Sequence, residues 1–230
     1  MTGFDLQLLL SGPYHDWLLH GLAISLGLTA GTVVMAFPLA VVVALLRLSS
    51  RAPLRAIGTA YVESIRNVPL LAHMLFWYFG APELLPDVLK RWLYTQDIEL
   101  IGALIALTLY TAAYVAEDIR SGIRAIPPQQ LQAGLALGFS YLTAMRLIVL
   151  PQAFRVTVPP LISQAINVWK NTSVATVIGV SELMYQAAKV EAASFRSTEA
   201  FAFATASYLA ISLLLTSASL AYVHRYHLRT

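Results

Sequence analysis

One uninterrupted apolar segment, residues 22–46, limits what this chain can fold into. The only polar side chains among its 25 residues are Ser25, Thr29 and Thr32. As an α-helix the segment would be about 37 Å long, which exceeds the ~30 Å hydrocarbon core of a bilayer. Backbone groups inside lipid must be hydrogen-bonded within the protein, and one long segment achieves this only as a helix. The chain is therefore predicted to be a membrane protein.

The composition agrees with a membrane protein and excludes several other classes. Apolar residues make up 58% of the 230 residues and charged residues 12%, against about 45–50% and about 25% in soluble domains. A net charge of +3 without a basic cluster gives no indication of nucleic-acid binding. The chain has no cysteine, which excludes disulfides and thiolate metal sites, and no metal site is predicted. No cleavable signal is expected, because the first basic residue is Arg47.

Four further segments complete a predicted all-α bundle of about five transmembrane helices. In the second, residues 68–80 supply only 13 apolar positions, about 20 Å of helix, so this helix must begin near Ala56. The fourth is expected to begin at Pro159 and Pro160, with Lys170 close to its middle. The five predicted spans are residues 22–46, 56–80, 98–119, 159–180 and 200–223.

Basic residues predict the orientation of this bundle. Residues 47–55, residues 120–155 and the tail after residue 223 hold three, four and two Lys or Arg, nine in total, whereas the loops on the opposite side hold four. Cytoplasmic loops carry the excess of Lys and Arg. The N-terminus is therefore expected outside, and the loop 121–155 and the C-terminus are expected in the cytoplasm.

Polar residues inside the predicted spans are the sharpest indication of function. Glu63 and Arg66 are three residues apart and can neutralise each other on one helix face. Tyr110, Tyr114 and Glu117 form a stripe on another helix. Ionisable groups at this depth usually mark a transport path, and the alternative is that they only tie helices together. The predicted substrate pathway comprises Glu63, Arg66, Asn67, Tyr110, Tyr114, Glu117, Asn167, Lys170 and Asn171.

The interval 121–155 has the pattern of a helical hairpin between spans. Pro127 and Pro128 suit the first turn of a helix, and Gly138 can take the left-handed conformation that ends one. This predicts a helix over 128–137.

A second helix is predicted after the glycine turn. Ser140 can cap it, and its end or kink is expected at Leu150, because the residue before Pro151 is disfavoured in helical conformation. The small residues Ala133 and Gly134 would let another backbone approach the first helix, which favours a docking element. The alternative is an amphipathic connector on the membrane surface.

Several segments carry a resemblance to a known family. The loop contains Q-L-Q-A-G-L-A-L-G at 130–138, then I-V-L-P-Q-A at 148–153 and Arg155. The other matching segments are Y-V-E at 61–63 with Arg66 and P-L-L at 69–71, T-A-A-Y at 111–114 with Glu117, Arg120, Gly122 and Ile123, and K-N-T-S at 170–173 with Ile178, Gly179, Glu182 and Leu183. In this order the chain resembles the permease subunits of ATP-binding-cassette (ABC) importers for polar amino acids, whose cytoplasmic loop is known as the EAA loop. Two departures are Gln132, where the loop usually has glutamate, and Gly134, where its second alanine is usual.

The resemblance implies a single permease domain over residues 1–230, in the inner membrane and with the type I ABC-importer architecture. It implies a pair of ABC ATPases that bind ATP and Mg, so that this chain needs no cofactor, and an extracytoplasmic substrate-binding protein. Because five spans make half a pathway, a second permease subunit, identical or homologous, is expected within the lipid. The residues predicted to couple to the ATPases are Gln132, Ala133, Gly134, Gly138 and Pro151.

The predicted function is transport and not catalysis. None of the three lysines precedes Ser or Thr, so a G-x-x-x-x-G-K-[ST] phosphate loop is absent and ATP must be bound by another chain. Arg66 and Lys170 suit a substrate with an acidic or amide side chain, such as glutamate, aspartate or glutamine. An ion-coupled secondary carrier is the alternative, and it predicts internal repeats that the sequence does not show. A non-transporting scaffold would leave the polar stripes unexplained.

Overall fold

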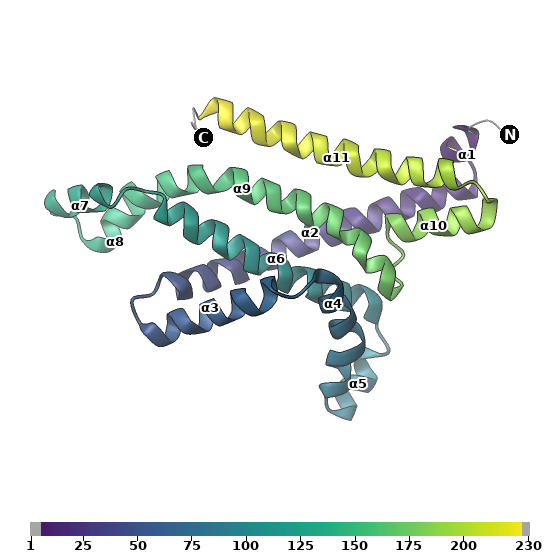
Figure 1. Ribbon diagram of the computed structural model, residues 1–230, viewed down its shortest axis with the longest axis horizontal. Coiled ribbons are helices and arrows are strands. Elements are labelled where there is room, and N and C mark those ends of the chain that lie inside the picture. Colours follow the sequence, from purple (N-terminus) through teal and green to yellow (C-terminus); the bar gives the residue numbers. More distant parts are fainter. Residues whose placement is uncertain (1–5, 227–230) are drawn as a thin grey trace.

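The computed structural model describes residues 6–226 of the chain. These residues form helices and no strand, which confirms the predicted all-α fold. The long helices run side by side in an elongated bundle (Figure 1). The α-helices are α1 Leu6–Leu10, α2 Pro13–Leu48, α3 Ala52–Arg66, α4 Leu70–Leu75, α5 Asp87–Leu93, α6 Ile98–Arg124, α7 Pro128–Ala136, α8 Tyr141–Ala144, α9 Leu150–Asn171, α10 Leu183–Ser194 and α11 Ser197–Arg225. Short π and 3₁₀ helices, η1 Phe76–Gly80, η2 Ala81–Leu84, η3 Met145–Val149 and η4 Thr172–Ile178, connect them.

Three of these helices, α2, α6 and α11, are long and apolar enough to cross a membrane by themselves. They contain 36, 27 and 29 residues, and an 18-residue stretch of each has a mean hydropathy of 2.3, 1.8 and 1.6, respectively. Buried alanines, among them Ala40 on α2 and Ala112 on α6, belong to one apolar cluster and let these two helices pack closely. At 1.5 Å per residue α2 is about 54 Å long, so it extends well beyond the hydrocarbon core.

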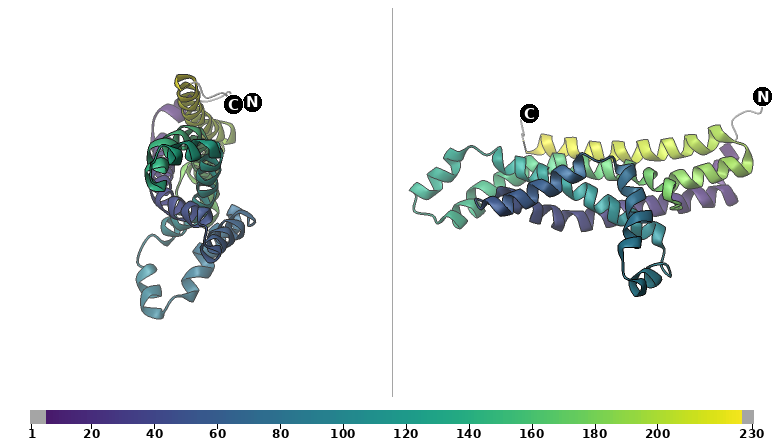
Figure 2. Two further views of the ribbon diagram at one scale, coloured as in Figure 1. Left: turned by 90° about the vertical axis from the view of Figure 1, so that its left-hand side faces the viewer. Right: turned by 60° about the horizontal axis from the view of Figure 1, so that its bottom comes forward.

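The second predicted span is not one helix, contrary to the expectation for residues 56–80. α3 ends at Arg66 and α4 begins at Leu70, with Pro69 directly before it. The residue before a proline is disfavoured in helical conformation, and the proline itself has no N–H to continue the ladder. Beyond this break, α4, η1, η2 and α5 project sideways from the bundle as an arm (Figures 1 and 2).

The predicted hairpin is confirmed for its first helix and its caps. α7 covers Pro128–Ala136, and Gly138 follows it with φ of 84°. The side chain of Ser140 accepts a hydrogen bond from the backbone nitrogen of Thr143 at 3.2 Å and so caps α8. Of the end or kink expected at Leu150, the end is not found, because η3 leads directly into α9, and the irregularity beside Pro151 is the π turn η3 itself. The wider π turn leaves room for the ring of Pro151, which would clash in a regular helix.

The fourth predicted span also differs from the structure. α9 begins at Leu150 and passes through Pro159 and Pro160, where the sequence predicted a start. It ends at Asn171, where the 3₁₀ helix η4 continues to Ile178. Lys170 therefore lies in the last turn of α9, directly before η4.

A buried carboxylate, Glu182, joins four helices at the end of the bundle that contains α10. It is completely buried. The hydroxyl of Ser25 on α2 donates to it at 3.1 Å, that of Tyr208 on α11 donates at 3.0 Å, and that of Thr176 on η4 also donates. Glu182 caps α10 by accepting from the backbone nitrogen of Tyr185 at 2.8 Å. Within the described residues, all its hydrogen-bond donors are neutral.

Candidate functional site

A pocket between α6 and α9 gathers most of the residues predicted to line a pathway. Its volume is about 180 Å³, which is room for roughly six water molecules at ~30 Å³ each. Because side chains one helical turn apart share a face, Tyr110 with Tyr114 and Asn167 with Asn171 line the same space from opposite helices. The lining residues are Tyr110, Thr111 and Tyr114 on α6, and Gln164, Asn167, Val168, Lys170 and Asn171 on α9.

Cationic groups lie in and beside this pocket. Lys170 lines it, and its ammonium has no ion-pair partner among the described residues. The guanidinium of Arg66 lies 4.8 Å from the ring centre of Tyr114, a cation–π contact that holds it next to the pocket wall. The hydroxyls of Tyr110 and Tyr114 are 3.1 Å apart and share a hydrogen bond. The pocket therefore combines positive charge with hydroxyl and amide groups.

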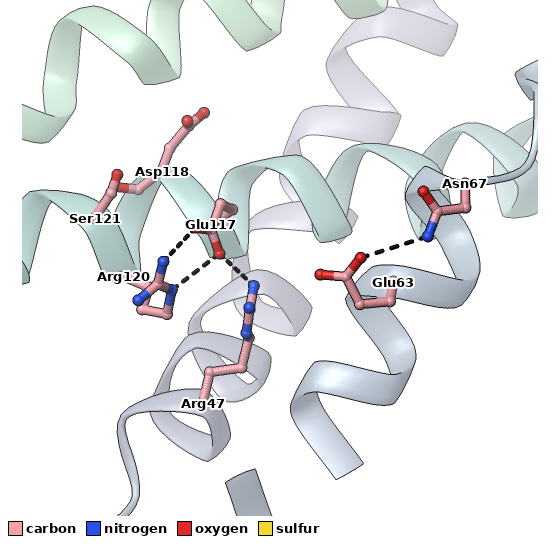
Figure 3. Close-up of polar contacts among 7 residues, drawn as sticks. All are labelled: Arg47, Glu63, Asn67, Glu117, Asp118, Arg120 and Ser121. Atoms are coloured by element: carbon pink, nitrogen blue, oxygen red, sulfur yellow. Dashed lines mark hydrogen bonds and ion pairs between the residues drawn. The ribbon is translucent and has the colours of Figure 1, made fainter. Parts of the chain in front are cut away.

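Glu63 and Asn67 lie outside the pocket, in the part of α3 that leads to the break. The amide of Asn67 donates to the carboxylate of Glu63 at 3.4 Å, and both side chains are exposed (Figure 3). The pairing of Glu63 with Arg66 that the spacing suggested is not formed, because Arg66 lies over Tyr114 instead. Among the described residues, Glu63 has no ion-pair partner.

Glu117 is also outside the pocket, although it belongs to the same helix stripe as the tyrosines. Its carboxylate is bonded by the guanidinium groups of Arg47 at the end of α2 and Arg120 on α6, the latter through Nε at 2.9 Å (Figure 3). The side chains of these three residues are 24%, 12% and 17% exposed, respectively. Glu117 thus connects two helices, and its charge is neutralised by groups of the same chain.

Two residues that the predicted pathway omitted belong to this region. Gln164 lines the pocket, and its amide nitrogen donates to the carboxylate of Asp118 on α6 at 2.8 Å. Asn167 in turn donates to the amide oxygen of Gln164 at 3.3 Å. The signal in the sequence was the helical spacing of Gln164 with Asn167 and Asn171. Nothing in the sequence connected Asp118 to them, because the contact crosses between two helices.

The predicted coupling residues lie in and around α7. Gln132 and Ala133 are exposed, as are Gly138 and Pro151. Gly134 is buried against α8 and η3, because a Cβ there would lie 3.0 Å from the Cβ of Ala144. Gly134 therefore serves the hairpin's own packing, whereas Ala133 remains exposed. Apolar side chains that remain exposed on the hairpin are Leu135, Leu137, Phe139, Tyr141, Leu142 and Leu147.

Comparison with known proteins assigns the class. Residues 36–227 match the family described as "Binding-protein-dependent transport system inner membrane component". The chain is 37% identical over 206 residues to the "Probable glutamine ABC transporter permease protein GlnM" of Bacillus subtilis (strain 168), covering 88% of each chain. It is 34% identical over 203 residues to the "Glutamate/aspartate import permease protein GltJ" of Escherichia coli (strain K12), covering 86% of this chain and 82% of the relative.

A solved structure of an amino acid ABC transporter has the same fold as this chain. The structure described as "Crystal structure of an amino acid ABC transporter with histidines" superposes with a TM-score of 0.85 at 29% identity, over 98% of this chain and 100% of that one. A bundle of apolar helices with a polar pocket between two of them fits a membrane transport protein. The chain belongs to the inner-membrane permease components of binding-protein-dependent ABC importers. None of these comparisons supports the ion-coupled carrier.

Proposed function

We propose that the chain is the permease subunit that carries a polar amino acid with an acidic or amide side chain through an ATP-driven importer. Glutamate, aspartate and glutamine are the proposed substrates. The observation that supports this choice most is the pocket between α6 and α9, which is lined by an unpaired Lys170 and by no carboxylate among the described residues. Lys170 can bind the carboxylate that every amino acid has, and its positive charge opposes a cationic side chain such as that of arginine but not an acidic or amide side chain.

The polar residues divide into a proposed binding set and a set with other roles. Tyr110, Tyr114, Asn167, Lys170 and Asn171 line the pocket, and Arg66 stands beside it. Glu117 ties α2 to α6, and Glu63 with Asn67 lies on the exposed part of α3. The relatives named for glutamine and for glutamate/aspartate support an amide or acidic substrate, whereas another relative, 33% identical over 204 residues, is named for arginine.

A second permease subunit, identical or homologous, would complete the path. Ordinary ligand pockets measure about 300–1,000 Å³, whereas this one measures about 180 Å³. A smaller, open pocket is expected if one chain supplies one wall and the partner the other. The two subunits would be related by rotation about an axis along the pathway.

Further partners follow from the family and from the predicted orientation. Two ABC ATPases with ATP and Mg would dock on the cytoplasmic hairpin, where Gln132, Ala133, Gly138 and Pro151 are exposed and buried Gly134 holds the hairpin together. A substrate-binding protein would dock at the opposite end. The orientation is tested by reporters: one fused after Thr230 should be cytoplasmic, one inserted near Pro86 should be external, and the same side for both would remove this topology.

The experiment that tests the function is uptake by the reconstituted complex. The permease is purified with its partner ATPases and placed in liposomes with the binding protein outside and ATP inside. Uptake of radiolabelled glutamate, aspartate or glutamine that requires ATP, with arginine not accumulated, is the expected result. ATP-dependent uptake of arginine alone would overturn the proposed substrate class.

The coupling role is tested at the glycine turn. Gly138 has φ of 84° and nothing within 4 Å of the position of a Cβ, so a side chain there is opposed by the backbone conformation and not by a clash. Gly138→Val should therefore deform the turn after α7 and reduce substrate-stimulated ATP hydrolysis several-fold, with insertion at normal levels. Gly27→Ala, on α2 where a Cβ also meets nothing, is the matched control. Normal stimulation in Gly138→Val would mean that this hairpin does not transmit motion.

A further inference from the structure

A chain of hydrogen bonds runs from a carboxylate outside the pocket to the amides that line it. Asp118 on α6 accepts from Gln164 on α9 at 2.8 Å, and Gln164 accepts from Asn167 at 3.3 Å. Gln164 and Asn167 line the pocket, whereas Asp118 does not. In Figure 3, Asp118 points from α6 to the side opposite Arg47, away from the ion pairs of Glu117. This series of hydrogen bonds is therefore separate from the ion pairs of Glu117.

The chemistry of Asp118 decides which way the amide of Gln164 is turned. An amide end has one donating nitrogen and one accepting oxygen, which are interchangeable in shape. A carboxylate accepts hydrogen bonds and donates none, so the nitrogen of Gln164 must face Asp118. Its oxygen then faces Asn167 and the pocket, as the bond from Asn167 requires. Without Asp118 the amide could turn over and present hydrogen-bond donors to the same space.

The orientation of this amide matters because no carboxylate lines the pocket among the described residues. An amino acid carries an ammonium group, which needs acceptors, and the carboxylate of Glu117 is already bonded by Arg47 and Arg120. Resting on the proposed function, we propose that Asp118 is a positioning residue that turns the amide oxygen of Gln164 toward the substrate's ammonium group. Lys170, on the same helix, takes the substrate's carboxylate. The substrate is thereby oriented in the pocket.

An amide oxygen suits a transport site better than a carboxylate would. A path must bind its substrate strongly enough for entry and weakly enough for release. A hydrogen bond between an ammonium and a neutral oxygen is weaker than a full ion pair in the same surroundings. Asp118 contributes selectivity for the ammonium through Gln164 without placing its own charge in the path.

Substrate pairs that differ only in the ammonium group test this inference. Binding of L-glutamate and glutarate, and of L-glutamine and glutaramate, is measured on the assembled permease–ATPase complex in nanodiscs. In Asp118→Leu the Kd of the amino acid should rise roughly tenfold, the order expected for one misaligned hydrogen bond to a charged group. The Kd of the analogue without the ammonium should change less than twofold. Asp118→Asn keeps an acceptor but can also donate, so its loss should be smaller.

An exchange of the two side chains separates positioning from packing. Gln164→Glu alone sets two carboxylates against each other and should weaken binding of the amino acid. Adding Asp118→Asn restores a donor opposite an acceptor, and the double variant should recover affinity relative to Gln164→Glu. If the Asp118→Leu variant does not assemble, this pair of variants alone tests whether Asp118 positions Gln164. Ser163→Ala is the matched control, because among the described residues the Ser163 hydroxyl bonds only the carbonyl of Pro159 within α9.

The outcomes distinguish this inference from the proposed function. Equal losses for both members of a pair, wild-type affinity in Asp118→Leu, or no recovery in the double variant would each overturn the role of Asp118. Lys170→Gln should weaken both members of each pair alike. Lys170→Gln could leave the Kd of both members of each pair unchanged while the Asp118 variants behave as expected. In that case Lys170 does not bind the substrate's carboxylate, but the role of Asp118 toward the ammonium group stands. A wild-type complex that binds neither amino acid overturns both.

Discussion

Glu117 and Glu182 are both carboxylates held within the bundle, and the partners that stabilise them differ in charge. Glu117 on α6 is bonded by the guanidinium groups of Arg47 and Arg120, and its side chain is 24% exposed. Glu182 at the start of α10 is completely buried and bonded by three hydroxyls and one backbone N–H. One carboxylate is neutralised by cations near solvent, and the other is solvated by neutral dipoles.

The difference indicates which end of the bundle is rigid. All three members of the Glu117 cluster are partly exposed, and the predicted orientation puts them at the cytoplasmic end of the spans, where water can replace a lost partner. Water cannot do so at Glu182, where lost bonds leave buried donors on α2, η4, α10 and α11 unsatisfied. We therefore expect the α10 end to be the fixed part of the permease and the Arg47 end to be the part whose contacts can change during transport.

The largest effect is expected from Glu182→Leu. Each buried donor left without an acceptor costs about 1–3 kcal/mol, so the loss of several should lower the free energy of unfolding by at least about 3 kcal/mol. Thermal unfolding of the purified permease in detergent, followed by light scattering and fluorescence, measures it. Glu182→Gln retains an acceptor, so its melting temperature should lie between those of wild type and Glu182→Leu. A melting temperature for Glu182→Leu equal to that of wild type would contradict the rigid α10 end.

A smaller effect is expected from Glu117→Gln. The change leaves Arg47 and Arg120 facing each other without an anion. Because these side chains are partly exposed, the free energy of unfolding should fall by only about 1–2 kcal/mol. Uptake should fall by the same factor for glutamate and glutamine, because Glu117 does not line the pocket. Arg47→Gln combined with Glu117→Gln should recover part of the stability. A loss confined to one substrate would show that Glu117 takes part in selection after all.

The smallest effect is expected at Glu83 in the arm, where a carboxylate is paired with a cation at the surface. Hydrogen bonds from Lys90 and then Tyr94 hold the pKa of Glu83 below its ordinary value of 4.5. Because the pKa is lowered on folding, the pair stabilises the arm above pH 4.5 and loses this contribution as the pH falls through the lower, folded-state pKa. Glu83→Gln should leave the melting temperature unchanged at pH 7, since exposed pairs contribute little. A clear shift at pH 7 would mean that the arm is packed against another subunit.

The sequence predicted the helices well where local chemistry decides, and less well where tertiary packing does. Pro128 and Gly138 bound α7 as expected, because proline and positive φ act on their own residues. Pro159 and Pro160 did not begin a helix, since packing of α9 against α6 keeps the helix intact through two missing donors. At Pro69 the helix does break, although α3 and α4 both pack against α6, because the residue before a proline is disfavoured in helical conformation, and the chain turns into the arm.

The candidate site was predicted by residue type and only partly by position. Helical spacing identified Tyr110 with Tyr114 and Asn167 with Asn171, which line one pocket. The spacing of Glu63 and Arg66 suggested a pair that the structure does not form, because a tyrosine ring on α6 competes for the guanidinium. The hydrogen bond from Gln164 to Asp118 depends on how α6 and α9 pack against each other, which a single sequence does not reveal.

The most direct test of the account is uptake by the reconstituted complex with Lys170→Gln, for acidic and amide substrates in parallel. Lys170 lines the pocket, and its ammonium is unpaired among the described residues, so removing its charge should leave the fold intact. Lys170 binds a carboxylate that both substrates have, but glutamate has a net charge of −1 and glutamine none, so loss of the positive charge should lower glutamate uptake at least threefold more than glutamine uptake. Arg66→Gln should show the same direction with a smaller difference, since Arg66 stands beside the pocket. Unchanged uptake of both substrates in Lys170→Gln would contradict the claim that the pocket between α6 and α9 is part of the path.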